Sequence, residues 1–331
     1  MNSFGRIFRV NIFGESHGES VGINIDGVPA GLPLTEDDLL PDLERRKGGK
    51  QKGTTPRQEA DYPFFKSGIF NGKTTGFPIT ILFENNNTRS EDYQKQRSFP
   101  RPGHADWVAH QKFGGNEDYR GGGHFSARLT TALVAAGAIA KKLMAQIKIT
   151  AAVTEINGET DLEKGLQNAI DAKDSVGGIV ECKVTGVPVG LGEPYFDSLE
   201  SLFAHAMFAI PAVKGVEFGA GFAAAKMFGS QHNDAIENME GRTKTNHAGG
   251  IVGGISNGNE LVFRIAIKPT SSTPKEQQSL NWETGEVESF SIKGRHDLCV
   301  ALRAPVIVEA ATALVLVDCM LMEQLIPRVI R

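Results

Sequence analysis

Two segments of this chain are apolar on nearly every side, and they restrict its fold more than any other feature. The first runs from Leu129 to Met144 and the second from Pro305 to Leu321. Both have the length of a helix, and a helix without a polar face must be covered on several sides. Glu309 interrupts the second segment, which is shorter than the roughly 18–20 apolar residues of a membrane span. We therefore expect two buried helices and no membrane segment.

Short strand-like runs supply the surfaces that could cover these helices. They alternate or are β-branched, with Gly, Asn and Pro between them, and they lack a regular strand–helix–strand order. This pattern predicts an α+β fold in which buried helices lie between antiparallel sheets. The clearest runs are Val21 to Ile25, Ile79 to Phe83, Ile179 to Val184 and Leu261 to Ile267.

The chain contains two internal echoes. The sequence GVPAGL at 27–32 returns as GVPVGL at 186–191, each time after a strand-like run and before an acidic helix start. A second pair, GIFNG at 68–72 and GISNG at 254–258, precedes a strand in each half. We interpret residues 1–331 as one domain built from a pseudo-repeat, 1–150 and 151–331, with chance similarity of turn sequences as the alternative. Sites at the junction would then use residues of both halves.

Composition excludes several classes of protein. The formal net charge is −4, so the chain is not a generally basic nucleic-acid binder, and an anionic ligand needs a local basic patch. The three cysteines form no CxxC pair, the eight histidines show no zinc-ligand spacing, and the N-terminus has no signal-peptide core. We expect a cytoplasmic protein without a structural metal.

Two familiar patterns are present but lie in the wrong context. GESHG at 14–18 matches the nucleophile elbow of hydrolases, yet a strand rather than a helix follows it. GAGFAA at 219–224 matches a dinucleotide fingerprint, but no strand–helix–strand unit surrounds it, so a glycine turn is the better interpretation. His17 stays a candidate proton donor, with a structural loop histidine as the alternative.

Several segments are suited to binding anions. RRKGGKQKGTTPR at 45–57 holds six positive charges among glycines and threonines, which predicts either a mobile anion-binding loop or a solvated charge run. RGGGHFSAR at 120–128 leads directly into the first apolar helix, where backbone N–H groups can meet an anion. KPTSS at 268–272 adds a lysine and three hydroxyl groups.

Taken together, these motifs resemble the chorismate synthase family. The resemblance rests on nine segments in the family's order: FGESHG (13–18), DGVPAGL (26–32), RPGHAD (101–106), DYRGGG (118–123), SAR (126–128), AVKGVE (212–217), NHAGG (246–250), KPTSS (268–272) and GRHD (294–297). It implies a β-α-β sandwich, a homotetramer, and a lyase of the shikimate pathway of aromatic amino-acid biosynthesis. The implied reaction removes phosphate and a proton from 5-enolpyruvylshikimate 3-phosphate, giving chorismate, with reduced FMN required and no net redox change.

The resemblance also implies roles for individual residues. His17 would protonate the departing phosphate, His104 would keep the reduced flavin anionic, and Asp297 would act beside flavin N5. The substrate would be bound by Arg46, Lys52, Arg57, Arg101 and Arg128. The flavin would be held by His124, Phe125, Ser126, Pro211, Ala212, Gly253, Lys268, Pro269, Thr270, Ser271, Ser272 and Arg295.

Two alternatives remain at this point. The chain could be an NADPH-dependent flavin reductase, since some members of the family reduce their own flavin. It could also be a non-catalytic polyanion-binding protein, although such a protein would not need His17, His104 and Asp297 as proton-transfer groups.

Overall fold

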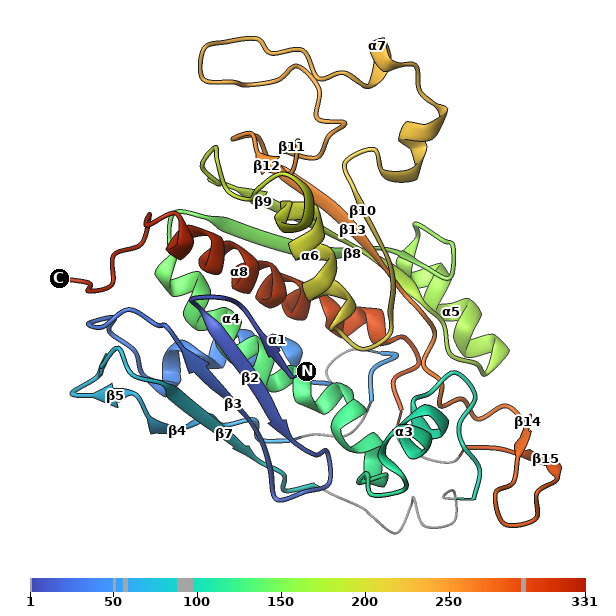
Figure 1. The fold of residues 1–331 in the computed structure, drawn as a ribbon. Helices are drawn as coiled ribbons and strands as arrows, with labels where there is room; N and C mark the ends of the chain where they lie inside the picture. Colours follow the sequence, from blue (N-terminus) through green and yellow to red (C-terminus); the bar gives the residue numbers. More distant parts are fainter. Residues whose placement is uncertain (1, 50–51, 56–58, 88–97, 293–295) are drawn as a thin grey trace.

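The computed structural model describes residues 2–49, 52–55, 59–87, 98–292 and 296–331 (Figure 1). Its centre is a pair of contacting helices, α4 (Thr130–Leu143) and α8 (Ala304–Met322), which are the two apolar segments of the sequence. The pair lies between two antiparallel sheets, so the expected α+β class with buried helices is confirmed.

Each sheet comes from one part of the chain. The order in the first sheet is β1 (Ser3–Phe4), β2 (Arg9–Gly14), β3 (Ser20–Asp26), β7 (Ile79–Glu84) and β4 (Phe64–Ser67). The order in the second sheet is β10 (Val213–Phe218), β13 (Leu261–Ile267), β9 (Gly178–Thr185) and β8 (Lys148–Ile156). Every pairing is antiparallel, and all four strand-like runs named above form strands.

The remaining elements surround this core. The other helices are α1 (Leu40–Arg46), α3 (Asp106–Phe113), α5 (Leu162–Ala172), α6 (Leu199–Phe208) and α7 (Gly229–His232). Small hairpins are formed by β5 (Ile69–Phe70) with β6 (Lys73–Thr74), β11 (Ile251–Val252) with β12 (Ile255–Ser256), and β14 (Gln277–Leu280) with β15 (Val287–Phe290). Short 3₁₀ turns are η1 (Glu36–Asp38), η2 (Arg120–Phe125), η3 (Ala127–Leu129), η4 (Tyr195–Asp197), η5 (Gly221–Lys226) and η6 (Val300–Arg303).

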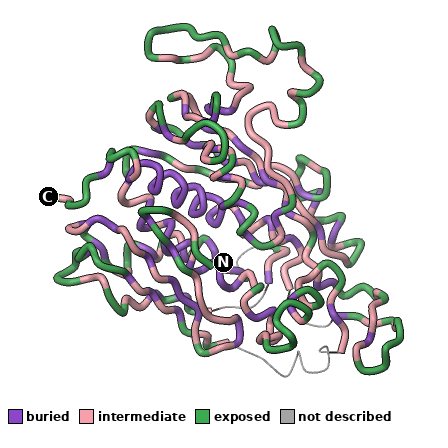
Figure 2. The backbone as a smooth tube through the Cα atoms, in the orientation of Figure 1, coloured by how far each residue is buried: buried purple, intermediate pink, exposed green. Residues whose placement is uncertain are grey.

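Helix α8 is buried along almost its whole length, as Figure 2 shows by its purple trace. Seventeen of its nineteen residues are buried, including the two acidic ones. Glu309 accepts hydrogen bonds from Arg45 and Lys141, which places charged partners from α1 and α4 around it. Asp318 accepts three backbone N–H groups at the entry to β2, at 2.7–2.9 Å. Both acids are therefore paired as buried charges must be. The helix over 300–322 is long and apolar enough for a membrane span by composition, but it is a core helix here.

The two central helices approach closely at Gly137 of α4. A Cβ atom at this position would lie 2.3 Å from the Cβ of Ala310 and 2.4 Å from its Cα, in α8. These distances are far below van der Waals contact, so only glycine allows this separation of the helices.

The two sheets share one order of corresponding strands. In chain order, β2, β3, β4 and β7 of the first sheet correspond to β8, β9, β10 and β13 of the second, and both sets are arranged first–second–fourth–third. In each half a small hairpin precedes the last of these strands, β5–β6 in one and β11–β12 in the other. A buried helix follows that last strand in both halves, α4 or α8.

The echoed turns also make matching hydrogen bonds. The Thr74 hydroxyl donates to the Pro29 carbonyl at 2.6 Å and accepts from the Leu32 N–H at 2.9 Å. The Ser256 hydroxyl makes the same two bonds to the corresponding residues Pro188 and Leu191, at the same distances. This correspondence supports the proposal of a duplicated unit. Strand β8 spans residue 150, so the junction of such units would lie between α4 and β8 rather than at 150/151.

Candidate active site

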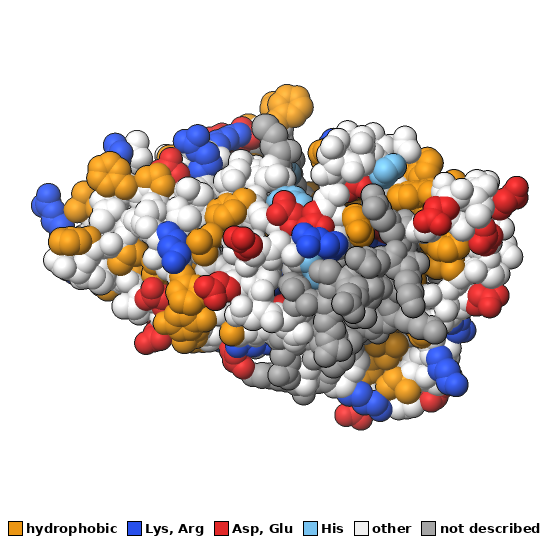
Figure 3. Space-filling model, turned by 90° about the horizontal axis from the view of Figure 1, so that it is seen from below, with side chains coloured by type: hydrophobic (Ala, Val, Ile, Leu, Met, Phe, Trp, Pro, Cys, Tyr) orange, Lys and Arg blue, Asp and Glu red, His pale blue; other side chains and the backbone are white. Residues whose placement is uncertain are grey.

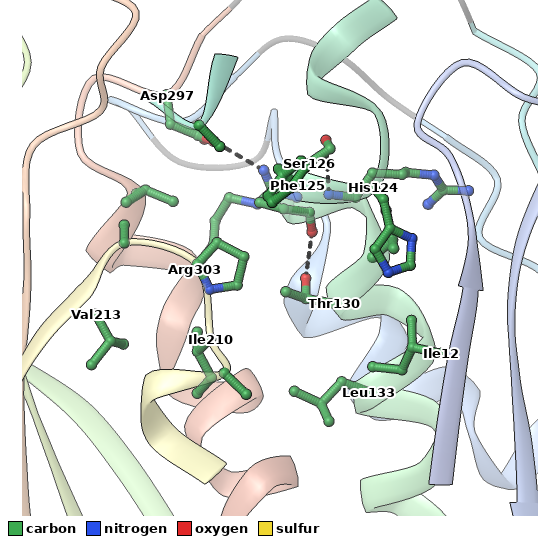
Figure 4. Close-up of a pocket in the computed structure, with 18 of the residues that line it drawn as sticks. Ile12, His124, Phe125, Ser126, Thr130, Leu133, Ile210, Val213, Asp297 and Arg303 are labelled. Carbon is green, nitrogen blue, oxygen red and sulfur yellow. Dashed lines mark hydrogen bonds and ion pairs between the residues drawn. The ribbon is translucent and has the colours of Figure 1, made fainter. Parts of the chain in front are cut away.

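A cavity of about 760 Å³ lies where the two buried helices begin. Helix α4 follows the turn η3, which carries Arg128, and α8 follows the turn η6, which carries Arg303. The N-terminal end of a helix carries partial positive charge, and here each end has an arginine beside it. Residues from two parts of the chain, 2–133 and 205–314, line this cavity, and Figure 4 shows some of them.

The cavity is strongly cationic although the chain is acidic. Among the described residues, seven lysines and arginines line it but only three carboxylates. On the face seen in Figure 3, basic, acidic and histidine side chains gather near the centre, beside the segments drawn in grey. The cations are Arg46, Lys47, Arg101, Arg128, Lys214, Lys268 and Arg303, and the carboxylates are Glu59, Asp61 and Asp297.

Asp61 joins two of the predicted substrate-binding arginines. It accepts a 2.6 Å hydrogen bond from Arg46 and another from Arg128, and all three side chains are buried. Burial lowers the pKa of Arg46 to about 10, against the attraction of Asp61. Burial acts to raise the pKa of Asp61, but the two arginines have the larger effect and bring the pKa below its usual value. The carboxylate is therefore ionised. One carboxylate between two guanidinium groups leaves a net positive charge beside the cavity.

The basic segment at 45–57 begins at the end of a helix rather than in a loop. Arg45 and Arg46 form the last turn of helix α1, and Arg45 is tied to Glu309 of α8. Lys52 donates to the side chain of Gln167 at 3.0 Å and does not line the described cavity. Arg57 lies outside the described residues, so its expected role stays a prediction.

Asp297 is held as an acceptor at the cavity wall. One oxygen accepts the Thr55 N–H at 2.8 Å and the other accepts Arg303 Nη1 at 3.1 Å. Arg303 also donates through Nε to the carbonyl of Arg46 at 3.0 Å. Arg303 thus connects the end of α1 to the predicted acid–base residue.

The glycine loop before α4 lies between the two predicted catalytic histidines. Gly121 lines the cavity, and a Cβ there would lie 2.1 Å from Cε1 and Nδ1 of His17. A Cβ at Gly122 would lie 3.5 Å from Nε2 of His104, which itself lines the cavity. His17 is buried behind Gly121 and is not among the residues that form the described wall. The loop therefore brings both rings to one site and keeps them on separate faces.

The opposite wall fits a large, mostly apolar ring system with polar edges. It is formed by aliphatic side chains of β2, α4, α8 and the turn after α6, including Ile12, Leu133, Leu314 and Ile210. Two buried polar atoms at this site, Thr270 Oγ1 and His296 Nε2, have no hydrogen-bond partner among the described residues. A flavin has an apolar ring face and several edge donors and acceptors, so the residues present fit such a group.

Most of the predicted site residues lie in this cavity. Those that line it are Arg46, Arg101, His104, His124, Phe125, Ser126, Arg128, Pro211, Ala212, Lys268, Thr270, Ser271, Ser272 and Asp297. His124 directs Nδ1–H to the Gly14 carbonyl at 2.8 Å, which fixes the orientation of its ring.

Two further predicted residues are placed differently. Pro269 is not part of the described lining, although both of its neighbours are. Gly253 lies in the hairpin between β11 and β12, near the start of α6, whereas the cavity touches the end of that helix. The ten residues of α6 separate these points by about 15 Å, so Gly253 does not reach this cavity. Arg295 lies outside the described residues.

Asp61, His296 and Arg303 are among the residues of the site that were not predicted from the sequence. Burial lowers the pKa of His296 to about 4, and nearby Arg101 and His104 act in the same direction, so the ring is neutral at pH 7. Arg303 carried a signal in the sequence, because it precedes the second apolar helix as Arg128 precedes the first. Asp61 lies in a polar segment without a motif and carried none.

Comparison with known proteins gives one family. The family model described as chorismate synthase matches residues 8–321. A chorismate synthase of Chitinophaga pinensis is 69% identical over 332 aligned positions, covering all of both chains. One from Archaeoglobus fulgidus is 46% identical and covers 99% of each. A solved structure titled as a crystal structure of chorismate synthase aligns with a TM-score of 0.72 and 27% identity, over 97% of this chain and 93% of that one.

The match spans both sheets, both buried helices and the cationic cavity at their ends. This chain belongs to the chorismate synthase family.

Proposed function

We propose that this chain converts 5-enolpyruvylshikimate 3-phosphate to chorismate in the cavity at the start of α4 and α8, with reduced FMN bound there. The observation that carries the proposal is the charge of this cavity. Its seven cations exceed its three carboxylates by four among the described residues, in a chain whose net charge is −4.

The substrate matches this excess. It carries one phosphate and two carboxylates, about −4 in total near pH 7. Arg101 and Arg128, the Arg46–Asp61 pair and the two helix ends would meet these groups with donors and positive potential. A neutral or cationic substrate would leave the same charges without compensation.

Three side chains would take part in proton transfer. His17 would protonate the departing phosphate, reaching it past Gly121, where the loop has no side chain. His104 would exchange a proton with the cofactor through the ring edge that faces Gly122. Asp297, held by Thr55 and Arg303, would act beside flavin N5 when the substrate loses its proton. Groups of this kind contribute about 10²–10⁴-fold to a rate.

The cofactor would be held by the apolar wall and by the segment 268–272. Thr270 Oγ1 and His296 Nε2 are the two buried atoms that a bound ring edge would satisfy. Reduced flavin, when bound, supplies electron density as phosphate leaves and recovers it as the proton is lost. The aliphatic side chains around it would exclude water from that exchange.

The homotetramer and the cytoplasmic location implied by the family are part of this proposal. Large apolar side chains, including Tyr195, Phe196 and Met239, are 88–98% exposed around η4 and the extended segment after α7. Contacts between subunits would cover such side chains. Sedimentation of the purified protein tests the assembly.

The deciding experiment is anaerobic phosphate release from 5-enolpyruvylshikimate 3-phosphate with reduced FMN, oxidised FMN or no flavin. We expect phosphate release and chorismate absorbance only in the sample with reduced FMN. NADPH oxidation without the shikimate substrate would instead identify a flavin reductase.

Matched variants test the assigned residues. His17→Ala and His104→Ala should each lower the rate by at least about 10²-fold while the substrate still binds. His232→Ala, in α7 and away from the cavity, should behave as the unaltered protein. Unchanged turnover in the first two variants would exclude these histidines from catalysis.

A further inference from the structure

The Asp106 carboxylate holds together the loop that carries His104. The His104 N–H donates to the Arg101 carbonyl at 3.1 Å, and the Arg101 N–H donates to Asp106 Oδ2 at 3.0 Å. Asp106 is also the first residue of helix α3, where a negative charge is favourable. Its carboxylate is therefore fixed by the backbone as well as by its side-chain partners.

Three side chains form a tight triangle in this loop. Arg101 donates to Asp106 through Nε at 2.7 Å and through Nη2 at 2.8 Å, and His104 Nδ1 lies 2.6 Å from Asp106 Oδ1. Burial acts to raise the pKa of Asp106, but the hydrogen bonds from Arg101 and His104 bring it well below its usual range. The carboxylate is thus ionised and can only accept hydrogen bonds.

This geometry determines which ring nitrogen carries a proton. Two acceptors cannot lie 2.6 Å apart without a hydrogen between them, so Nδ1 of His104 must be the donor to Asp106. Arg101 Nη2 is 3.0 Å from the same Nδ1, but a protonated Nδ1 has no lone pair to accept from it. The Arg101 proton consequently points to Asp106.

The other ring nitrogen, Nε2, belongs to a side chain that lines the cavity. Nε2 lies on the side of Gly122, which has no side chain to cover it, and no hydrogen bond reaches Nε2 from any residue that the structure describes. The charged and titratable groups around this ring are Arg101 and Asp106 of its own loop and His296 of the neighbouring segment.

We propose that Asp106 is a positioning residue for His104: it holds Nδ1 as an N–H donor and so leaves Nε2 as the atom that exchanges a proton inside the cavity. This inference rests on the proposed function only for the identity of the proton-transfer partner. A carboxylate that fixes the tautomer of a catalytic imidazole is a general device, and removing it misdirects the ring proton.

The first test reads the tautomer directly and needs no flavin. ¹⁵N-histidine labelling of the full chain, with His104→Asn to assign the signal, should show His104 protonated at Nδ1 near neutral pH. In Asp106→Asn the amide is a weaker acceptor, and Arg101 can then donate to Nδ1. We expect the signal to move toward the Nε2–H tautomer.

The second test uses turnover. Asp106→Asn should lower kcat by about 10–100-fold, with a smaller change in KM for the shikimate substrate. If Asp106→Asn acted only by displacing the substrate-binding Arg101, it would raise KM instead of lowering kcat. In a His104→Asn background the same substitution should cost less than about twofold, because its target is absent.

Glu117→Gln is the matched control. Glu117 lies 3.2 Å from Nδ1 of His110, which belongs to the same helix as Asp106, and Glu117 does not line the described cavity. It should leave kcat unchanged while altering the His110 signal.

Two results would overturn the proposal. One is a His104 ring protonated at Nε2 in the unaltered protein. The other is an equal loss of kcat from Asp106→Asn with and without His104. If the chain made no chorismate at all, the proposed function would fail while the tautomer measurement still decided the role of Asp106.

Discussion

Replacing Gly121 with alanine tests whether the glycine loop sets the position of His17. Gly121 has φ of +59°, and an added Cβ would lie 2.1 Å from two atoms of the buried His17 ring. Ordinary contact needs about 3.5 Å, so the ring or the loop must move by roughly 1.4 Å. A displacement of about 1 Å can cost about 10²-fold in rate, which equals about 2.7 kcal/mol of transition-state stabilisation. The left-handed backbone adds about 1–2 kcal/mol of strain to the folded state.

Gly158→Ala separates these two effects. Gly158 has φ of +77° but nothing within 4 Å of an added Cβ, so this variant has the strain without the clash. Both variants should lose stability in urea unfolding, and Gly121→Ala should lose more because of its clash. Only Gly121→Ala should also lose about 10²-fold in kcat, measured as anaerobic chorismate formation at saturating substrate. Equal kcat in the two variants would refute the argument that the loop positions His17.

Two further predictions concern stability. Gly137→Ala should reduce the free energy of unfolding by about 1–3 kcal/mol, because the new methyl meets the backbone of Ala310 and cannot rotate away. The control Gly229→Ala, in α7 with open space around the new methyl, should change the free energy of unfolding by less than about 0.5 kcal/mol. Equal stability of the two variants would contradict the close helix crossing. The pKa of His296 is about 4 in the folded chain and about 6.5 in the unfolded chain. Between pH 6.5 and pH 4 the unfolded chain therefore binds one more proton than the folded chain. The free energy of unfolding falls as the pH drops through this range. Urea unfolding at pH 7 and pH 5 should show about 2 kcal/mol of this loss in the unaltered protein and not in His296→Asn, and an equal loss in both would assign it to other groups.

The sequence was informative where a pattern is local. The apolar segments at 129–144 and 305–321 predicted helices within one or two residues of α4 and α8, because a helix buried on all sides has a distinctive composition. The alternation in 261–267 likewise matches β13, whose residues are buried and half-buried in turn.

The parts that failed depend on distant partners. The arginines at 45–46 were assigned to a loop because glycines follow them, yet Glu309 and Asp61 hold them at the end of a helix. Glu309 is 264 residues away from Arg45 in the chain, and no spacing rule connects the two. Asp297 itself was predicted, but its partner Thr55, 242 residues away in the chain, was not.

The place of α8 in the fold has a consequence for how the chain folds. This helix contacts α1 and α4 from the first part of the chain and α6, β8 and β9 from the second part. It covers apolar surface of all of them, yet it is synthesised after them. During synthesis the apolar faces on either side of its place stay open to water and to other nascent chains until residues 304–322 emerge. The core between the two sheets therefore cannot be completed until this late step of synthesis.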